Sequence, residues 1–316
     1  MSFSNEVKEE IMSQELESDC CCFATLCSYI NSLGSLEITK QGVSFSIKTE
    51  NPALLTNLQD VVNKIYSDKI DELLVTSKTI GKTVLYDFSV PTVVGNRILM
   101  DCGILKIGDK NAVEINDGID HHIIMEDCCK KWYIKTSFLC VGTLSVPSGD
   151  NFSKGYHFEL EYSSANQAKI IANLLGEFGF IARKVERNGK YVVYMKESEM
   201  IADFLAFVGA TKSYLKLQNE MITRDMRNSI NRQSNCISAN IDKTVQASLG
   251  QLHAIEIIEA TIGIDSLPEN LRKYAILRKR NPEASLSELI TLSDEKITKS
   301  GMNYKLNKIV EISKNL

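Results

Sequence analysis

Two helix patterns separated by a short turn lie near the C-terminus of the 316-residue chain: PEASLSELI at 282–290 and ITKSGMNYKLNKIV at 297–310. In the first pattern, Ser285 and Glu288 have the Ser-x-x-Glu spacing of a capping box, which fixes where a short helix begins. In the second, Thr298 is placed to cap a longer helix. Helix, turn and helix at this spacing are what a helix-turn-helix needs to place its second helix in a DNA groove.

The second of these helices is predicted to have one apolar and one polar face. Met302, Leu306, Ile309 and Val310 recur at helical spacing and should pack on the core. Gly301 in the first turn costs about 1 kcal/mol relative to Ala, a cost that a close approach of DNA would explain. Asn reads adenine edges, Lys reaches guanine or phosphate, and Ser and Tyr hold phosphate oxygens. The predicted DNA contacts on this helix are Lys299, Ser300, Asn303, Tyr304, Lys305 and Lys308.

The distribution of charge along the chain also favours DNA binding, since a polar helix face alone is equally typical of a solvated helix in a small bundle. The formal net charge is −4, but the residues from Lys212 onward include 16 basic and 12 acidic side chains, a net of +4. The remainder is therefore at −8. A basic C-terminal part on an acidic N-terminal part is typical of a DNA-contacting module carried by a part that does not contact DNA. A basic cluster precedes the two helices and consists of Arg272, Lys273, Arg278, Lys279 and Arg280.

The N-terminal two thirds of the chain repeats one α/β pattern. In each copy a helical pattern ends at a glycine, Gly34 or Gly142, and a strand, a helix and a strand follow. We therefore predict an internal duplication with a sheet in each half. The fold class is α+β: a duplicated α/β domain at 1–212, a helical linker at 213–235 and an all-α helix-turn-helix domain at 236–316. The predicted strands and helices of the two copies lie at 19–33, 43–47, 51–65 and 83–88, and at 128–141, 156–162, 165–178 and 190–195.

Several segments give the chain a family resemblance. The chain resembles the WhiA family of bacterial transcription regulators. This resemblance implies a degenerate, duplicated LAGLIDADG homing-endonuclease-like domain followed by a helix-turn-helix. It also implies a role in transcription, and in sporulation or in cell division and chromosome segregation, and it adds Asn240 and Lys243 as contacts to the DNA backbone. The matching segments are SFSxxVKEE at 2–10, MRNSINR at 226–232, NCxxANIDKT at 235–244, Leu267-Pro268, NPEASLxEL at 281–289 and ITKSGMN at 297–303.

The residues before the two glycines argue against nuclease activity. In LAGLIDADG nucleases, each of two packed helices ends in an acidic residue just before Gly, and the two carboxylates hold the catalytic metal ions. Here Leu33 and Val141 occupy those positions, and an apolar side chain cannot bind a hard cation. Glu37 lies near the first glycine, but Ser145 stands at the corresponding place in the second copy. The resemblance therefore predicts the nuclease fold without its chemistry.

Nine cysteines are present, three of them adjacent at Cys20, Cys21 and Cys22. Two sets of side chains carry metal-ligand chemistry, but adjacent cysteines on a helix point in different directions. We therefore expect reduced, buried thiols, and neither a metal nor another cofactor. The two sets are Cys20, Cys21, Cys22 and Cys27, and His121, His122, Cys128 and Cys129.

The N-terminus shows no signal-peptide pattern, and no window of 18 uninterrupted apolar residues predicts a membrane span. We expect a cytoplasmic, nucleoid-associated protein with no membrane partner. The sequence predicts a sequence-specific, non-catalytic transcription regulator that binds double-stranded DNA through its C-terminal domain. Two alternatives stay open: a metal-dependent nuclease, and an interaction protein whose N-terminal domain binds a protein or a small ligand.

Overall fold

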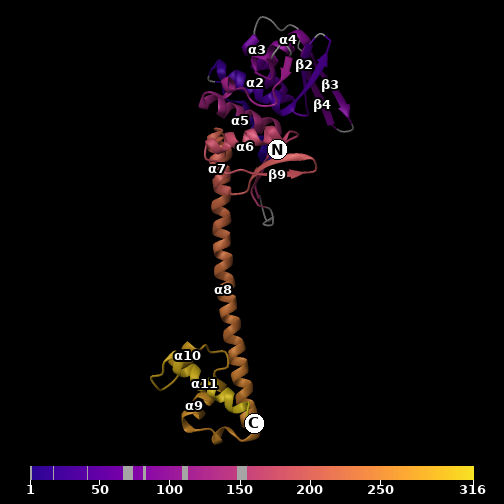
Figure 1. The fold of residues 1–316 in the computed structure, drawn as a ribbon. Helices are drawn as coiled ribbons and strands as arrows, with labels where there is room; N and C mark the ends of the chain where they lie inside the picture. The colour runs from indigo at the N-terminus through magenta and orange to yellow at the C-terminus, as the bar shows by residue number, and fades with distance from the viewer. Residues whose placement is uncertain are drawn as a thin grey trace. The chain divides into compact units, whose positions relative to one another are not determined.

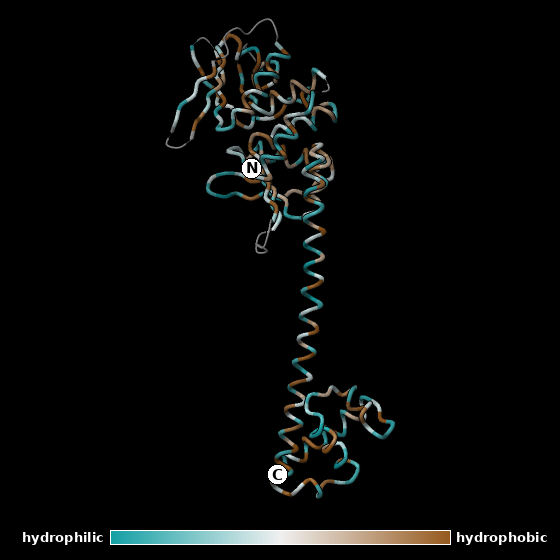
Figure 2. The backbone as a smooth tube through the Cα atoms, turned by 180° about the vertical axis from the view of Figure 1, so that it is seen from behind, coloured by the Kyte–Doolittle hydropathy of each residue, from teal (hydrophilic) through white to brown (hydrophobic). Residues whose placement is uncertain are grey.

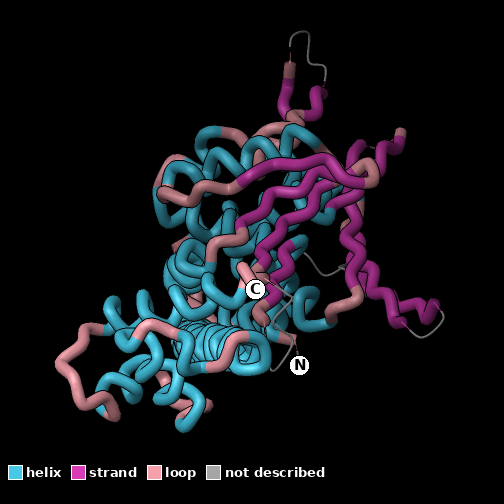
Figure 3. The backbone as a smooth tube through the Cα atoms, turned by 90° about the horizontal axis from the view of Figure 1, so that it is seen from below, coloured by secondary structure: helices cyan, strands magenta, loops and turns pink. Residues whose placement is uncertain are grey.

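The fold comprises two compact units, Met1–Thr223 and Arg224–Leu316, drawn as a ribbon in Figure 1. Helix α8 (Thr211–Thr261) contributes residues to both units. Strands are confined to the first unit in the described part of the chain, and the second unit contains only helices and loops (Figure 3). This computed structural model describes residues 2–16, 18–40, 42–66, 74–80, 83–108, 113–147 and 155–316.

The first unit repeats the order helix, two strands, helix, two strands, helix. Each half has an antiparallel four-stranded sheet, with strand orders β1-β2-β4-β3 and β7-β8-β10-β9. The predicted duplication is confirmed by this correspondence. The elements of the first half are α2 (Asp19–Leu33), β1 (Gly34–Thr39), β2 (Gly42–Thr49), α3 (Pro52–Tyr66), β3 (Leu74–Ile80), β4 (Thr83–Ser89) and α4 (Thr92–Asp101). Those of the second are α5 (Asp127–Val141), β7 (Gly142–Ser145), β8 (His157–Tyr162), α6 (Ala165–Glu177), β9 (Arg183–Arg187), β10 (Lys190–Met195) and α7 (Ser198–Phe207).

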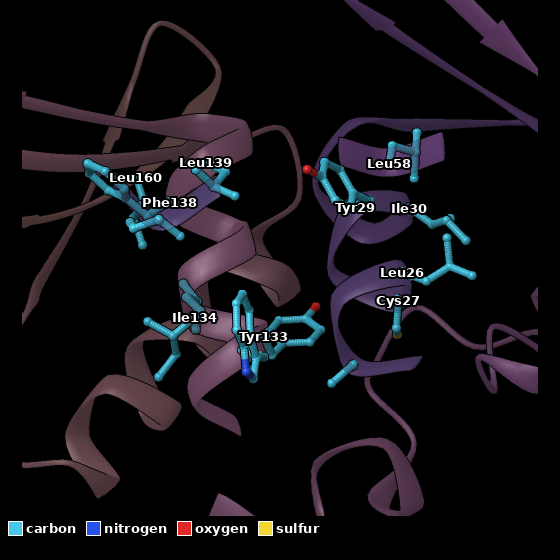
Figure 4. Packing of buried hydrophobic residues seen from close by; sticks show 14 of the residues in the cluster. Leu26, Cys27, Tyr29, Ile30, Leu58, Tyr133, Ile134, Phe138, Leu139 and Leu160 are labelled. Atoms are coloured by element: carbon cyan, nitrogen blue, oxygen red, sulfur yellow. The ribbon is translucent and has the colours of Figure 1, made fainter. Parts of the chain in front are cut away.

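Helices α2 and α5 pack against each other at the centre of this unit. The hydroxyl of Ser28 on α2 donates a hydrogen bond to the carbonyl oxygen of Tyr133 on α5 at 2.8 Å, and its oxygen lies 3.0 Å from that of Ser137. Small side chains at these points allow the two backbones to approach closely. The ring of Tyr133 points from α5 toward α2 (Figure 4), where its hydroxyl accepts a hydrogen bond from Asn31 at 3.1 Å.

A glycine at the end of each central helix lets the chain pass directly into a strand. Helix α2 ends at Leu33 and β1 begins at Gly34, while α5 ends at Val141 and β7 begins at Gly142. A Cβ atom at either glycine would collide with the carbonyl oxygen four residues earlier. The two glycines are therefore required by close packing against the last helical turn.

Helix α1 (Phe3–Met12) fixes the start of α8 within the first unit. The carboxylate of Glu10 accepts hydrogen bonds from the backbone N–H groups of Lys212 and Ser213, both at 2.8 Å. These are donors that a helix leaves unpaired in its first turn. Lys216 and Glu6 form an ion pair at 2.7 Å one turn further along. Between the two halves of this unit lie β5 (Leu105–Ile107), β6 (Val113–Ile115) and the 3₁₀ turn η2 (His121–Ile124).

The second unit is built around the C-terminal part of α8. The helices that follow are η3 (Ile264–Ser266), α9 (Glu269–Arg280), α10 (Leu286–Thr291) and α11 (Lys299–Ser313). Hydrophobic positions alternate with hydrophilic ones along them (Figure 2), and the apolar ones form one separate core. Its buried residues are Ile255, Ile258, Leu267, Leu271, Tyr274, Ala275, Leu289, Met302, Leu306 and Ile309.

Candidate nucleic-acid interface

The short helix α10 begins at the capping box that the sequence predicts. The Ser285 hydroxyl accepts a hydrogen bond from the N–H of Glu288 at 3.3 Å, and the Glu288 carboxylate accepts one from the N–H of Ser285 at 2.7 Å. This backbone hydrogen bond lowers the pKa of Glu288 below its usual range, because it stabilises the charged form. The box fixes the start of α10 and thus the turn that leads to α11.

Helix α11 begins at its predicted cap and buries most of its predicted apolar face. The Thr298 hydroxyl accepts a hydrogen bond from the N–H of Gly301 at 3.1 Å. Met302, Leu306 and Ile309 are almost completely buried. Val310, which the sequence also assigned to this face, is only half-buried. These contacts fix which side of α11 faces away from the core.

The choice of glycine at position 301 has a local structural reason. A Cβ atom there would lie 3.0 Å from Cγ1 of Ile297 and 3.3 Å from the Thr298 hydroxyl oxygen. These distances are tighter than ordinary carbon contacts, so a larger residue would require Ile297 and Thr298, the cap of α11, to shift by a few tenths of an ångström. This crowding is a local reason for the glycine, beside the close approach of DNA that the sequence suggests.

The six predicted contacts on α11 share one helix and reach solvent to different extents. Tyr304 is 64% exposed, and Lys305 and Lys308 are half-buried. Lys308 forms an ion pair with Glu311 at 2.8 Å. An exposed pair of this kind contributes at most about 1 kcal/mol, so a phosphate can replace the carboxylate at little cost. The exposed members are Lys299, Ser300, Asn303 and Tyr304.

Asn240 and Lys243 lie on α8, in the second unit but on a different helix from the other six. Both are exposed. The Asn240 amide donates a weak hydrogen bond to the sulfur of Cys236, 3.7 Å away on the preceding turn. Their accessibility is compatible with a contact to a DNA backbone.

The basic cluster before the two helices has a structural role that the sequence did not reveal. Arg278 is 2% exposed, and its guanidinium donates to the carbonyl oxygen of Ala284 at 2.6 Å, which holds the turn between α9 and α10. Arg272 likewise donates to the carbonyl oxygen of Asp265 at 2.6 Å. Lys273 and Lys279 form ion pairs with Glu295 and Glu259. Most of this cluster therefore stabilises the second unit, so the cluster supports DNA binding less than the sequence suggests.

In the first unit, Leu33 and Val141 lie at the ends of α2 and α5, where a LAGLIDADG nuclease has its metal-binding acids. Both are partly buried and pack against the hydrophobic core. Much of the positive charge of the two sheets is paired. The pairs are Lys48 with Asp87 at 3.6 Å, Arg187 with Glu159 at 3.6 Å, and Lys190 with Glu161.

The cysteines group differently from the two sets that the sequence suggested. Within the described ranges, four cysteines form the one cluster of three or more potential metal ligands: Cys20, Cys21, Cys128 and Cys129. Burial raises the pKa of the Cys21 thiol to about 11, whereas a hydrogen bond with Ser18 lowers the pKa of Cys20. The signal that predicts this grouping is the repeated Asp-Cys-Cys at 19–21 and 127–129, at equivalent places in the two halves.

Comparison with known proteins agrees with this architecture. Residues 19–105 match the WhiA N-terminal LAGLIDADG-like domain, residues 130–227 the WhiA LAGLIDADG-like domain, and residues 230–313 the WhiA C-terminal HTH domain. The fold and the capped helix pair thus define a class of protein in which a duplicated LAGLIDADG-like domain precedes a helix-turn-helix.

Similar proteins extend over the full length of the chain. A probable cell division protein WhiA of Oceanobacillus iheyensis is 34% identical and covers 100% of this chain and 98% of its own. One from Alkaliphilus metalliredigens is 35% identical, with coverages of 99% and 98%. The chain belongs to the WhiA family.

A crystal structure of full-length DUF199/WhiA from Thermotoga maritima has the same fold, with a TM-score of 0.58, 22% identity, and coverages of 100% and 99%. Every helix in the described ranges is too short or too polar to span a lipid bilayer.

Proposed function

We propose that this chain is a sequence-specific, DNA-binding regulator of transcription that acts in bacterial cell division and chromosome segregation, or in sporulation, and that it catalyses no reaction. The observation that carries the proposal is the exposed polar face of α11. The helix is capped at Thr298 and held to the core by Met302 and Leu306, so that Asn303 and Tyr304 face solvent. The names of the relatives, probable cell division proteins, support the cellular process.

In this proposal α11 is the recognition helix and lies in the major groove. Its 15 residues extend about 22 Å, and the N-terminal residues of a recognition helix are the ones that contact base edges. Asn303 reads a base edge, and Ser300 and Tyr304 bind phosphate oxygens. Phosphate and guanine contacts come from Lys299, Lys305 and Lys308. Further contacts to the DNA backbone come from Asn240 and Lys243.

A selection of binding sites from randomised double-stranded DNA tests the proposal. The full chain should enrich a defined motif, because base contacts impose a sequence preference that phosphate contacts do not. A variant with Asn303→Ala and Tyr304→Ala should lose the motif. A control variant with Arg183→Ala, exposed on β9 in the first unit, should retain it. Absence of any enriched motif with the unmodified chain would contradict sequence-specific binding.

The absence of catalysis rests on the residues at the ends of the two central helices. Leu33 and Val141 offer no oxygen ligand where the nuclease acids would stand. Incubation of supercoiled plasmid with the full chain and Mg²⁺ or Mn²⁺ should therefore leave the plasmid intact. A cleaving activity that gives nicked or linear plasmid and copurifies with the protein through successive columns would contradict this part of the proposal.

A protein partner suits the first unit better than DNA does. This part of the chain is acidic overall, and Lys48, Arg187 and Lys190 of its sheets are paired with carboxylates.

A complementation experiment separates DNA binding from the interaction role. If the full chain with Asn303→Ala and Tyr304→Ala fails to complement a deletion strain, DNA binding is the main activity. Full complementation by this variant would instead favour the interaction role and overturn the proposal.

A further inference from the structure

The first unit contains a cysteine pair at the start of each central helix. Cys20 and Cys21 follow Asp19 in the first turn of α2, and Cys128 and Cys129 follow Asp127 in the first turn of α5. The two Asp-Cys-Cys sequences occupy equivalent positions in the duplicated halves. Because α2 and α5 pack side by side, the duplication brings the two pairs together at one end of the helix pair.

The four sulfur atoms have the arrangement that a tetrathiolate metal site needs. All four Sγ atoms lie within 4.8 Å of one another, and those of Cys128 and Cys129 are 3.9 Å apart. Zinc–sulfur bonds of about 2.3 Å in a tetrahedron place sulfur atoms about 3.8 Å apart. A contraction of the cluster by about 1 Å therefore closes the site, which rotation of the side chains can supply.

The surroundings favour metal-bound thiolates. Both cysteine pairs lie at helix N-termini, where the helix dipole stabilises negative charge. The Ser18 oxygen lies 3.0 Å from Sγ of Cys20 and 3.2 Å from Sγ of Cys21, so its hydroxyl can donate to a ligand sulfur as outer-shell groups do. Cys21 and Cys129 are buried, whereas Cys20 is exposed and Cys128 half-buried, so a metal ion can enter from solvent on one side.

We propose that Cys20, Cys21, Cys128 and Cys129 bind one Zn²⁺ ion in a closed, structural Cys₄ site. Each thiol gives its proton to solvent and binds as a thiolate, and no oxidation or reduction takes place. The ion joins the first turns of α2 and α5, and thus clamps the two halves of the duplicated domain. It lies at the opposite end of these helices from Leu33 and Val141, so it is separate from the position of a nuclease centre.

The metal content of the full chain, purified under reducing conditions, tests this site. We expect one zinc ion per chain by inductively coupled plasma mass spectrometry. Cys20→Ser, which changes an exposed ligand, should still fold and should lose most of the zinc. Cys236→Ser removes an exposed cysteine of the second unit and should keep the full zinc content.

Replacement of zinc by Co²⁺ gives a second readout, because cobalt bound by four thiolates absorbs strongly by sulfur-to-metal charge transfer and shows tetrahedral d–d bands. The unmodified chain and Cys236→Ser should show both features, and Cys20→Ser and Cys129→Ser should not show the complete spectrum. The proposal is overturned if the unmodified chain binds neither Zn²⁺ nor Co²⁺, or if Cys20→Ser binds as much as Cys236→Ser. Iron with acid-labile sulfide, or disulfides among the four cysteines in freshly reduced protein, would equally contradict a mononuclear zinc site.

Discussion

Replacement of Asn303 by Ala should separate sequence recognition from stability. Asn303 is exposed on α11, and its side chain forms no hydrogen bond with the described residues. Ala is the better helix former by about 0.5 kcal/mol, so the thermal stability of the variant should be equal or slightly higher. A bidentate contact to adenine contributes about 1–3 kcal/mol of discrimination. At 1.4 kcal/mol per factor of ten, affinity for the selected site should fall by about 5- to 150-fold.

Fluorescence anisotropy with the selected duplex and with single base-pair variants measures this effect. The loss should be confined to the selected duplex, and the variant should no longer distinguish it from one changed base pair. Asn270→Ala is a matched control, since Asn270 is an exposed asparagine on α9 of the same unit. An equal loss of affinity on every duplex, or no loss on the selected one, would refute base reading by Asn303.

Three further changes probe charge, packing and pH dependence. Lys305→Ala should weaken binding on every duplex and reduce the slope of log K against log salt by about one unit; an unchanged slope removes this residue from the phosphate contacts. Arg278→Met leaves the Ala284 carbonyl oxygen without its donor and should destabilise α9–α11 by about 2–3 kcal/mol, measured by hydrogen exchange, while Lys279→Met should have little effect. The pKa of Glu288 is lowered in the folded protein, so its contribution to stability is present above the ordinary Glu range and is lost as the pH falls through the folded pKa. In thermal unfolding, the advantage of the unmodified chain over Glu288→Gln should accordingly disappear at low pH, and an advantage that persists there would contradict this assignment.

The strands that the sequence predicts are the central ones of each sheet. β2, β4, β8 and β10 alternate or carry continuous apolar residues because they are covered by helices, and each has two neighbouring strands. β1, β3, β7 and β9 were not predicted, and all four are edge strands. All five residues of β9, RKVER, are exposed, so nothing in its composition distinguishes it from a loop. Pairing with a neighbour defines such a strand, and pairing is a property of the folded chain.

The candidate sites also differ in whether their residues are close together in the sequence or only in the fold. The caps at Ser285 and Thr298 are local, so spacing along the chain was enough to predict them. The role of Arg278 depends on the carbonyl oxygen of Ala284 in the following turn, and only the fold places that oxygen beside a buried guanidinium. The four cysteines lie in two halves of a duplication, so no local spacing shows that they converge.

Genome-wide mapping of bound sites in living cells tests the central claim most directly, which is that α11 carries DNA recognition and the duplicated domain does not. The full chain, the variant with Asn303→Ala and Lys305→Ala, and the variant with Arg183→Ala and Lys184→Ala on β9 should be compared at equal abundance. The account predicts discrete sites for the unmodified chain and the β9 variant, and loss of these sites for the α11 variant. Sites that persist in the α11 variant and vanish in the β9 variant would contradict it.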